Sequence, residues 1–238
     1  MRLGLYYDLR NPGGARFWAR VYAAALDRIG WADRAGIGAI WVTEHHGFAD
    51  GYLPAPLTFC AAIATRTSRA RIGTAVVVSP LIPRPLPVWV GARGPRGARL
   101  AGRTGAGLLW IDRDLFEPYL AGLAQADPPA LPRVGGLANV FLADDPDRVL
   151  AAVREHGRRN RASYEDAGAA GRETAFPKLR ILTPAAAAAW ISELCAGLPV
   201  TDVFCFGDIG GLDDDLVERH TELAVRELAP VLAEEGEL

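Results

Sequence analysis

The chain has 238 residues, of which 50% are hydrophobic and 23% are charged, and its formal net charge is -2. This composition is typical of a soluble globular protein with one domain or two small ones. The charge gives no general attraction to nucleic acid or to an anionic membrane. No apolar stretch approaches the about 20 residues that span a bilayer, and the first residues do not resemble a signal peptide. We therefore expect a cytoplasmic protein.

Three cysteines, Cys60, Cys195 and Cys205, lie within apolar segments. They are few and odd in number, which favours buried thiols in a reducing cytoplasm over a disulfide or a metal site. The sequence also contains no zinc-ligand spacing, no Ser-His-Asp motif and no phosphate-binding P-loop. We therefore predict no metal.

Short apolar runs rich in β-branched residues predict the strands of this chain. The predicted strands cover residues 3–7, 39–42, 72–78, 88–91, 108–111, 134–142 and 201–206. Apolar residues at helical spacing, with capping signals at their ends, predict helices between most of these strands. The predicted helices cover residues 17–35, 56–67, 115–126, 145–157, 184–198 and 213–234, and a further one opens after residue 94. Residues 158–178 are polar and predict a surface loop or an irregular helix.

Strands that alternate with helices are typical of a parallel (β/α) barrel with right-handed crossovers. A complete eight-stranded barrel needs about 250 residues, and here the proline-rich segment 81–87 joins two strands without a helix. We therefore predict an α/β fold: an incomplete TIM-type barrel of about seven mostly parallel strands, with the fourth strand region deleted. It forms one domain over residues 1–238. Because such a sheet leaves exposed edges, we also expect a dimer.

The predicted strand at 39–42 stops abruptly at Thr43, Glu44, His45 and His46. Parallel α/β folds place their chemistry at the carboxyl ends of their strands, and histidine has the pKa range that proton transfer needs. A histidine that hydrogen-bonds a neighbouring strand is the structural alternative for His45. Glu44 would orient His45 or balance a nearby arginine, because a buried carboxylate needs such a partner. We expect His46 to be structural.

A glycine-rich turn at residues 91–97 ends one predicted strand and opens a helix. Free backbone amides and the positive end of the helix dipole make such a turn a natural seat for a phosphate. Arg84, Arg93 and Arg96 add positive charge, and a guanidinium fork suits a phosphate group. The alternative interpretation is a plain tight turn with solvated arginines.

Several of these segments resemble the bacterial luciferase-like flavin monooxygenases. The resemblance lies in residues 40–46, 54–56, 72–80, 87–95 and 201–207, and it covers most of the chain. The strand end Glu44-His45-His46 is its most specific part. The family implies a (β/α)8 barrel, often dimeric, that uses reduced flavin mononucleotide (FMN) and oxygen. Some branches use a deazaflavin instead, but the Glu-His-His strand end favours FMN.

The resemblance also implies roles for particular residues. His45 matches the active-site base and Glu44 its buried neighbour, while a non-proline cis peptide is implied beneath the flavin ring. The implied cofactor-binding residues are Ala75, Val76, Ala92, Arg93, Gly94, Arg96 and Gly97. A long family segment between the positions that match Pro80 and Pro87 is missing here, together with an arginine for the flavin phosphate. The non-fluorescent flavoprotein of luminous bacteria is similarly shortened and still binds flavin.

Other residues at predicted strand ends face the same mouth of the barrel. The candidate pocket residues are Tyr7, Asp8, Trp110 and Asp208. Trp41 and Trp89 lie within strands, where a tryptophan is more often part of the core than a ring-stacking group. His156 and His220 lie in helices with polar surroundings, and we do not expect them to be functional.

Three functions remain open. The first is a flavin-dependent monooxygenase that oxidises a small organic substrate with oxygen and reduced FMN. The second is a non-catalytic flavin-binding or accessory subunit, as a homodimer or as a heterodimer with a homologue. The third is a flavin-independent enzyme on the same scaffold that performs acid-base chemistry through His45. Flavin affinity and the activity of the His45→Ala variant would separate these hypotheses.

Overall fold

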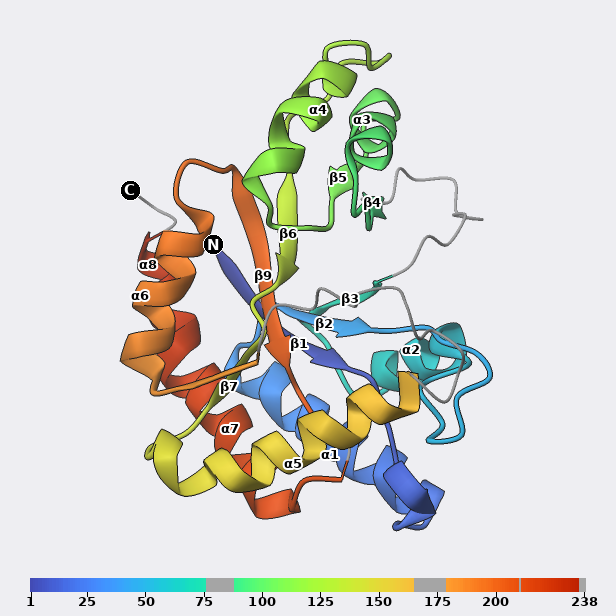
Figure 1. Ribbon diagram of the computed structural model, residues 1–238, viewed down its shortest axis with the longest axis vertical. Coiled ribbons are helices and arrows are strands. Elements are labelled where there is room, and N and C mark those ends of the chain that lie inside the picture. Colours follow the sequence, from blue (N-terminus) through green and yellow to red (C-terminus); the bar gives the residue numbers. More distant parts are fainter. Residues whose placement is uncertain (76–87, 165–178, 210, 236–238) are drawn as a thin grey trace.

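The computed structural model describes residues 1–75, 88–164, 179–209 and 211–235. Seven strands form one parallel sheet in the order β3-β2-β1-β9-β6-β5-β4, which curls as half of a barrel (Figure 1). The strands of this sheet are β1 (Arg2–Tyr7), β2 (Ala39–Val42), β3 (Arg71–Thr74), β4 (Trp89–Val90), β5 (Gly107–Leu108), β6 (Val134–Leu137) and β9 (Val200–Phe206). The predicted open barrel is therefore confirmed, and it opens between β3 and β4.

Helices pack around this sheet (Figure 1). They are α1 (Trp18–Ala35), α2 (Pro56–Ala64), α3 (Pro95–Arg103), α4 (Arg113–Leu123), α5 (Pro146–Tyr164), α6 (Pro184–Cys195) and α7 (Asp214–Leu223). The predicted closing helix continues from α7 through a π-helical turn, η3 (Ala224–Leu228), into α8 (Ala229–Glu235). None of the helices in the described part of the chain has the length and apolar character to cross a membrane.

One predicted strand, residues 134–142, is split in the structure. Its first half, β6, belongs to the main sheet, whereas β7 (Val140–Leu142) pairs with β8 (Arg180–Leu182) in a separate two-stranded sheet. The change of partner occurs between Ala138, whose N–H donates to Phe204, and Asn139, whose carbonyl accepts from Arg180. Strand β8 was not predicted from the sequence, because its three residues follow a long polar segment and show no alternation.

Two further boundaries differ from the prediction. Helix α5 runs on to Tyr164, although residues 158–164 were predicted as a loop or an irregular helix. A solvent-facing helix and a polar loop have similar compositions, so the pattern did not separate them. The end of the predicted strand at 72–78 lies beyond the described residues, as does the proline-rich segment with Arg84.

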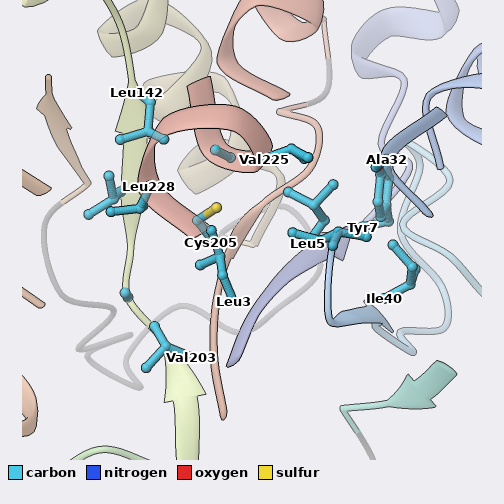
Figure 2. Packing of buried hydrophobic residues seen from close by; sticks show 14 of the residues in the cluster. Leu3, Leu5, Tyr7, Ala32, Ile40, Leu142, Val203, Cys205, Val225 and Leu228 are labelled. Atoms are coloured by element: carbon cyan, nitrogen blue, oxygen red, sulfur yellow. The ribbon is translucent and has the colours of Figure 1, made fainter. Parts of the chain in front are cut away.

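The outer face of the sheet forms the main core with the surrounding helices. Alternate residues of a strand point to opposite faces, and the outward set of β1 and β9 packs against α1, η3 and α8 (Figure 2). The outward residues include Leu3, Leu5 and Tyr7 of β1 and Val203 and Cys205 of β9. Full burial of one large apolar side chain contributes about 1.5–3 kcal/mol, so this layer is the principal source of stability.

The inner face of the half-barrel carries an aromatic layer. Trp41 of β2 and Trp89 of β4 meet edge to face with ring centroids 6.2 Å apart, and Trp41 stacks on Phe204 at 5.3 Å. The two indoles join strands on either side of the opening between β3 and β4. Glycine is required at Gly107, where an added Cβ would lie 2.5 Å from the Trp89 ring. Trp41 and Trp89 are thus packing residues, as expected.

The cysteines do not form disulfides in the structure. Cys60, Cys195 and Cys205 are all free thiols. Only Cys205 is fully buried, and Cys60 and Cys195 are half-buried, so the predicted burial holds for one of the three. Burial raises the pKa of the Cys205 thiol to about 12, so this thiol stays protonated.

Candidate functional site

The predicted site residues come from different segments of the chain, but most of them follow strands of one sheet. Because all seven strands are parallel, their carboxyl ends lie at the same edge of the half-barrel. The strands are followed there by Asp8 (β1), Glu44 and His45 (β2), Ala75 (β3), Ala92 and Arg93 (β4), Trp110 (β5) and Asp208 (β9). The fold therefore gathers at one edge the residues that the sequence singled out.

His45 is half-buried just beyond β2. Its Nδ1 lies 3.1 Å from Thr43 Oγ1, within hydrogen-bond distance. One face of its ring stacks on Tyr52, with centroids 3.9 Å apart and planes 11° from parallel. Phe48 approaches the imidazole edge to face at 5.5 Å. The His45 ring is thus held by three neighbours from its own strand end and the following loop.

The surroundings of His45 disfavour its charged form. Burial is the main cause that lowers its pKa to about 4, followed by the positive charges of Arg10, His46 and Arg93, against a small opposite effect of Glu44. Arg93 follows β4, on the far side of the sheet opening, and yet its charge acts on His45. The strand end with His45 and the glycine-rich turn with Arg93 therefore lie within electrostatic reach of each other.

Glu44 differs from the buried neighbour of His45 that the resemblance implies. Its side chain is 31% exposed, and its Oε1 lies 2.9 Å from Nε2 of the exposed His46. Adjacent residues of an extended segment point in opposite directions. Glu44 therefore points to the same side as His46 and away from His45. His46 is the surface partner of a carboxylate, and the expectation that Glu44 orients His45 is wrong in this geometry.

A buried ion group adjoins His45 and was missed in the sequence. The Arg10 guanidinium binds Asp50 with a 2.9 Å contact and lies 3.6 Å from Asp8. Its Cζ lies 3.7 Å from the centre of the Tyr52 ring. Burial raises the pKa of Asp8 to about 6, which Arg10 partly opposes. The only sequence signal for Arg10 was its position just after a predicted strand end that carries Asp8.

The glycine-rich turn after β4 fits a phosphate group. Gly94 is the N-cap of α3, and no side chain of the described residues caps this helix. Pro95 has no N–H, so the amides of Arg96 and Gly97 are the first donors of α3, and the first amides of a helix have no partner within it. A Cβ at Gly97 would lie 2.9 Å from that of Ala92, so glycine lets the helix start pack closely on the strand end.

The two arginines of this turn have different environments. The Arg93 guanidinium lies 5.3 Å from the centre of the Trp110 ring, which places Trp110 beside the turn. Arg96 is exposed in the first turn of α3. Amides at a helix start together with guanidinium groups form a donor set that suits a phosphate anion.

Two of the predicted pocket residues, Tyr7 and Asp208, are buried in other contacts. Tyr7 points to the outer face of the sheet and is fully buried in the main core, which is the opposite face from the predicted pocket. Asp208 is buried in an ion pair with Arg28 at 2.8 Å, and burial raises its pKa. Ala75 packs against the aromatic layer, but Val76 and the implied cis peptide lie outside the described residues.

The remaining two histidines lie on helices. His220 was expected in polar surroundings but is 1% exposed. Its Nδ1 accepts the Leu142 N–H at 2.8 Å, and its Nε2 bonds the Phe206 carbonyl. His156 lies within α5. In the described ranges no three His, Cys, Asp or Glu residues come together as a metal-ion site.

The fold and the strand-edge residues define the chain as an open parallel (β/α) barrel with a histidine and a glycine-rich helix start at one edge. The family model of luciferase-like monooxygenases matches residues 1–82 and 79–192. The chain therefore belongs to the luciferase-like monooxygenase family, and the resemblance noted in the sequence is confirmed.

Two curated relatives match short segments of the chain. The oxygenase component of a flavin-dependent trigonelline monooxygenase from Acinetobacter baylyi is 31% identical over 80 residues, which are 34% of this chain and 22% of that protein. The 4-hydroxyprotoasukamycin monooxygenase of Streptomyces nodosus subsp. asukaensis is 42% identical over 55 residues, which are 23% of this chain and 15% of that protein. The matched segments thus span less than a quarter of either relative.

Known structures share the fold over nearly the whole chain. A monooxygenase from Streptomyces bottropensis has a TM-score of 0.78 at 17% identity, and the match covers 97% of this chain and 99% of that protein's chain. The oxygenating component of 3,6-diketocamphane monooxygenase from Pseudomonas putida, in complex with FMN, has a TM-score of 0.65 at 14% identity, with coverages of 97% and 98%. An F420-dependent secondary alcohol dehydrogenase scores 0.62 at 13% identity, with coverages of 94% and 99%.

Proposed function

We propose that this protein is a flavin-dependent monooxygenase that oxidises a small organic substrate with oxygen and reduced FMN. The observation that carries the proposal is the common edge of His45 and the α3 start, where Arg93 is near enough to lower the pKa of His45. A proton-handling group and an anion seat at one rim are what a phosphate-bearing redox cofactor and its reaction require. The FMN-bound relative from Pseudomonas putida supports a flavin on this fold.

In this proposal, the α3 start holds the FMN phosphate. The amides of Arg96 and Gly97 donate to it, and the guanidinium groups of Arg93 and Arg96 neutralise its charge. When bound, reduced flavin supplies the electrons that activate oxygen. The protein's own task is to bind and orient the cofactor and to manage protons at the edge.

His45 performs the proton handling in this proposal. Because its pKa is about 4, the imidazole is neutral near pH 7, so it accepts a proton or a hydrogen bond and does not act as an acid. The inner face of the sheet carries a wall of uncharged, partly exposed side chains. It includes Tyr6, Trp89 and Leu137, and Phe206, which meets the Tyr6 ring edge to face. Such a wall suits a neutral organic substrate.

A titration with FMN and riboflavin tests the phosphate seat. We expect Arg96→Ala to weaken FMN binding about tenfold, because a charged hydrogen bond contributes about 1.5–3 kcal/mol. Riboflavin has no phosphate, so its affinity should not change. Arg99→Ala, at an exposed position later in α3, is the matched control and should bind FMN as the wild type does. A wild-type protein without FMN affinity, measured by absorbance at high concentration, would contradict the proposed function.

We also propose that the protein is a dimer. β3 and β4 end the sheet, and no described strand pairs with their outer edges, which are therefore available for covering by a second chain. Sedimentation at micromolar concentration is expected to give twice the monomer mass of 25.5 kDa. A single monomeric species would argue against the dimer without affecting the flavin proposal. A heterodimer with a homologue would appear as a larger species only when both chains are mixed.

A further inference from the structure

The arrangement of Arg10, Tyr52 and His45 is a three-layer stack at the site edge. Tyr52 is 5% exposed. The imidazole centre lies 3.9 Å from its ring centre, and the Arg10 Cζ lies 3.7 Å from the same point. Two planar groups this close to one ring centre would overlap if they shared a face. Tyr52 therefore lies between the guanidinium and the imidazole, with one on each face.

The stack is locked to the backbone from both sides. The Leu53 N–H donates to the Asp8 carbonyl, and the Leu53 carbonyl accepts the His45 N–H. Asp50 binds Arg10 at 2.9 Å and accepts the Tyr52 N–H on its other oxygen at 3.4 Å. The loop after β2 is thus fastened to the segment after β1, and Tyr52 has little freedom to move.

Trp18 seals this loop from the outside. A Cβ added at Gly51, which has a φ of +68°, would lie 2.0 Å from the Trp18 ring, so the indole lies directly on the loop backbone. The loop is therefore covered on its outer side, and its inner side presents Tyr52 to His45.

We propose that Tyr52 is a positioning residue for His45: clamped by Arg10 on its other face, it fixes the orientation of the imidazole and keeps this ring in its neutral form. The catalytic role of this positioning rests on the proposed function, in which His45 accepts a proton and therefore needs a fixed, neutral imidazole. It goes beyond that function in assigning the task to Tyr52 and Arg10, which do not themselves carry the proton.

Burial is the main cause that favours the neutral form of His45, and the charges around the ring act in the same direction. A tyrosine face attracts a cation, but Arg10 already occupies one face, so an imidazolium on the other would face a second positive charge. The carboxylates of Asp8 and Asp50 are engaged by Arg10. His46 and Arg93 add positive charge, and the negative charge of Glu44 opposes them. Stacking also removes water from one ring face.

NMR titration of the imidazole resonances in flavin-free protein tests the inference. The chain has four histidines, so single variants assign the His45 signal. We expect wild-type His45 to titrate near pH 4 and Tyr52→Leu to raise this value by about one pH unit or more, because water then reaches the ring. Tyr52→Phe keeps the stacked ring and should titrate as the wild type does. Tyr22→Leu, which removes a tyrosine that meets Phe59 edge to face elsewhere in the protein, is the matched control.

Two results would overturn the inference. One is a folded Tyr52→Leu protein with unchanged His45 titration. The other is a wild-type His45 that titrates near its ordinary value of 6.5, which needs no variant at all. The acid limb of the activity profile should move to higher pH in Tyr52→Leu, since His45 then becomes charged at higher pH. Failure of FMN binding would contradict the proposed function but leave the NMR result in force, so the two proposals fail separately.

Discussion

Gly122→Ala is expected to lower the free energy of unfolding by about 3 kcal/mol, the upper end of the usual cost of overpacking. Helices α3 and α4 lie side by side (Figure 1) and touch through their backbones at two glycines. A Cβ at Gly122 would lie 2.0 Å from the Arg99 carbonyl oxygen, and one at Gly102 would lie 2.1 Å from the Tyr119 carbonyl oxygen. Both clashes are with backbone atoms, so no flexible side chain can yield.

The sign of the change in stability distinguishes a backbone clash from the effect of helix propensity. Helix propensity alone favours alanine over glycine by about 1 kcal/mol, so without the clash the variant would be more stable than the wild type. Urea denaturation measures the difference. Ala121→Gly, at the exposed neighbouring position of α4, is the control and should cost only about 1 kcal/mol. A stabilised Gly122→Ala protein would show that the two helices do not touch as described.

The second large effect concerns His220 and pH. Because the Leu142 N–H donates to its Nδ1, the ring proton sits on Nε2 and bonds the Phe206 carbonyl. This neutral form bridges β7 and β9 where the two sheets separate. Burial lowers the pKa of His220 to about 4 from 6.5. The unfolded chain therefore binds more protons between these values, and about 3 kcal/mol of stability should be lost as the pH falls from 6.5 to 4.

Asp8 acts in the opposite direction over part of this range. Its folded pKa of about 6 exceeds the ordinary 3.8, so its contribution to stability rises as the pH falls from 6 towards 4. The His220 effect is therefore measured as a difference between the wild type and His220→Gln, in which Asp8 cancels. Glutamine can accept and donate the same two hydrogen bonds but does not titrate. We expect the wild type to have the larger free energy of unfolding at pH 7, and we expect the difference between the two proteins to shrink towards pH 4. Parallel stability curves would contradict the prediction.

The strands and their order were readable from local pattern. Apolar runs such as residues 39–42 become buried parallel strands because they have no polar face to expose. The proline-rich segment 81–87 indicated where the barrel opens, since proline excludes a helix interior. His45 and Arg93 each follow the carboxyl end of a predicted strand. Because parallel strands have their carboxyl ends at the same edge of the sheet, both residues were predicted to lie there.

The partners of the side chains were not readable in the same way. Sequence order suggested that Glu44 serves His45, but the extended backbone turns it to His46. Tyr7 ends a strand yet faces the helices, because its position in the alternation points outward. His220 looked solvent-facing among charged neighbours, although its side of α7 packs on the strands.

The sequence by itself determined the parallel half-barrel, its opening and the edge that carries the histidine, since each depends on short-range pattern and on proline. Only the tertiary structure decided that Tyr52 lies between Arg10 and His45 and that two glycines let α3 and α4 meet. These contacts join segments distant along the chain, and their geometry is decided by close packing, which local pattern does not encode.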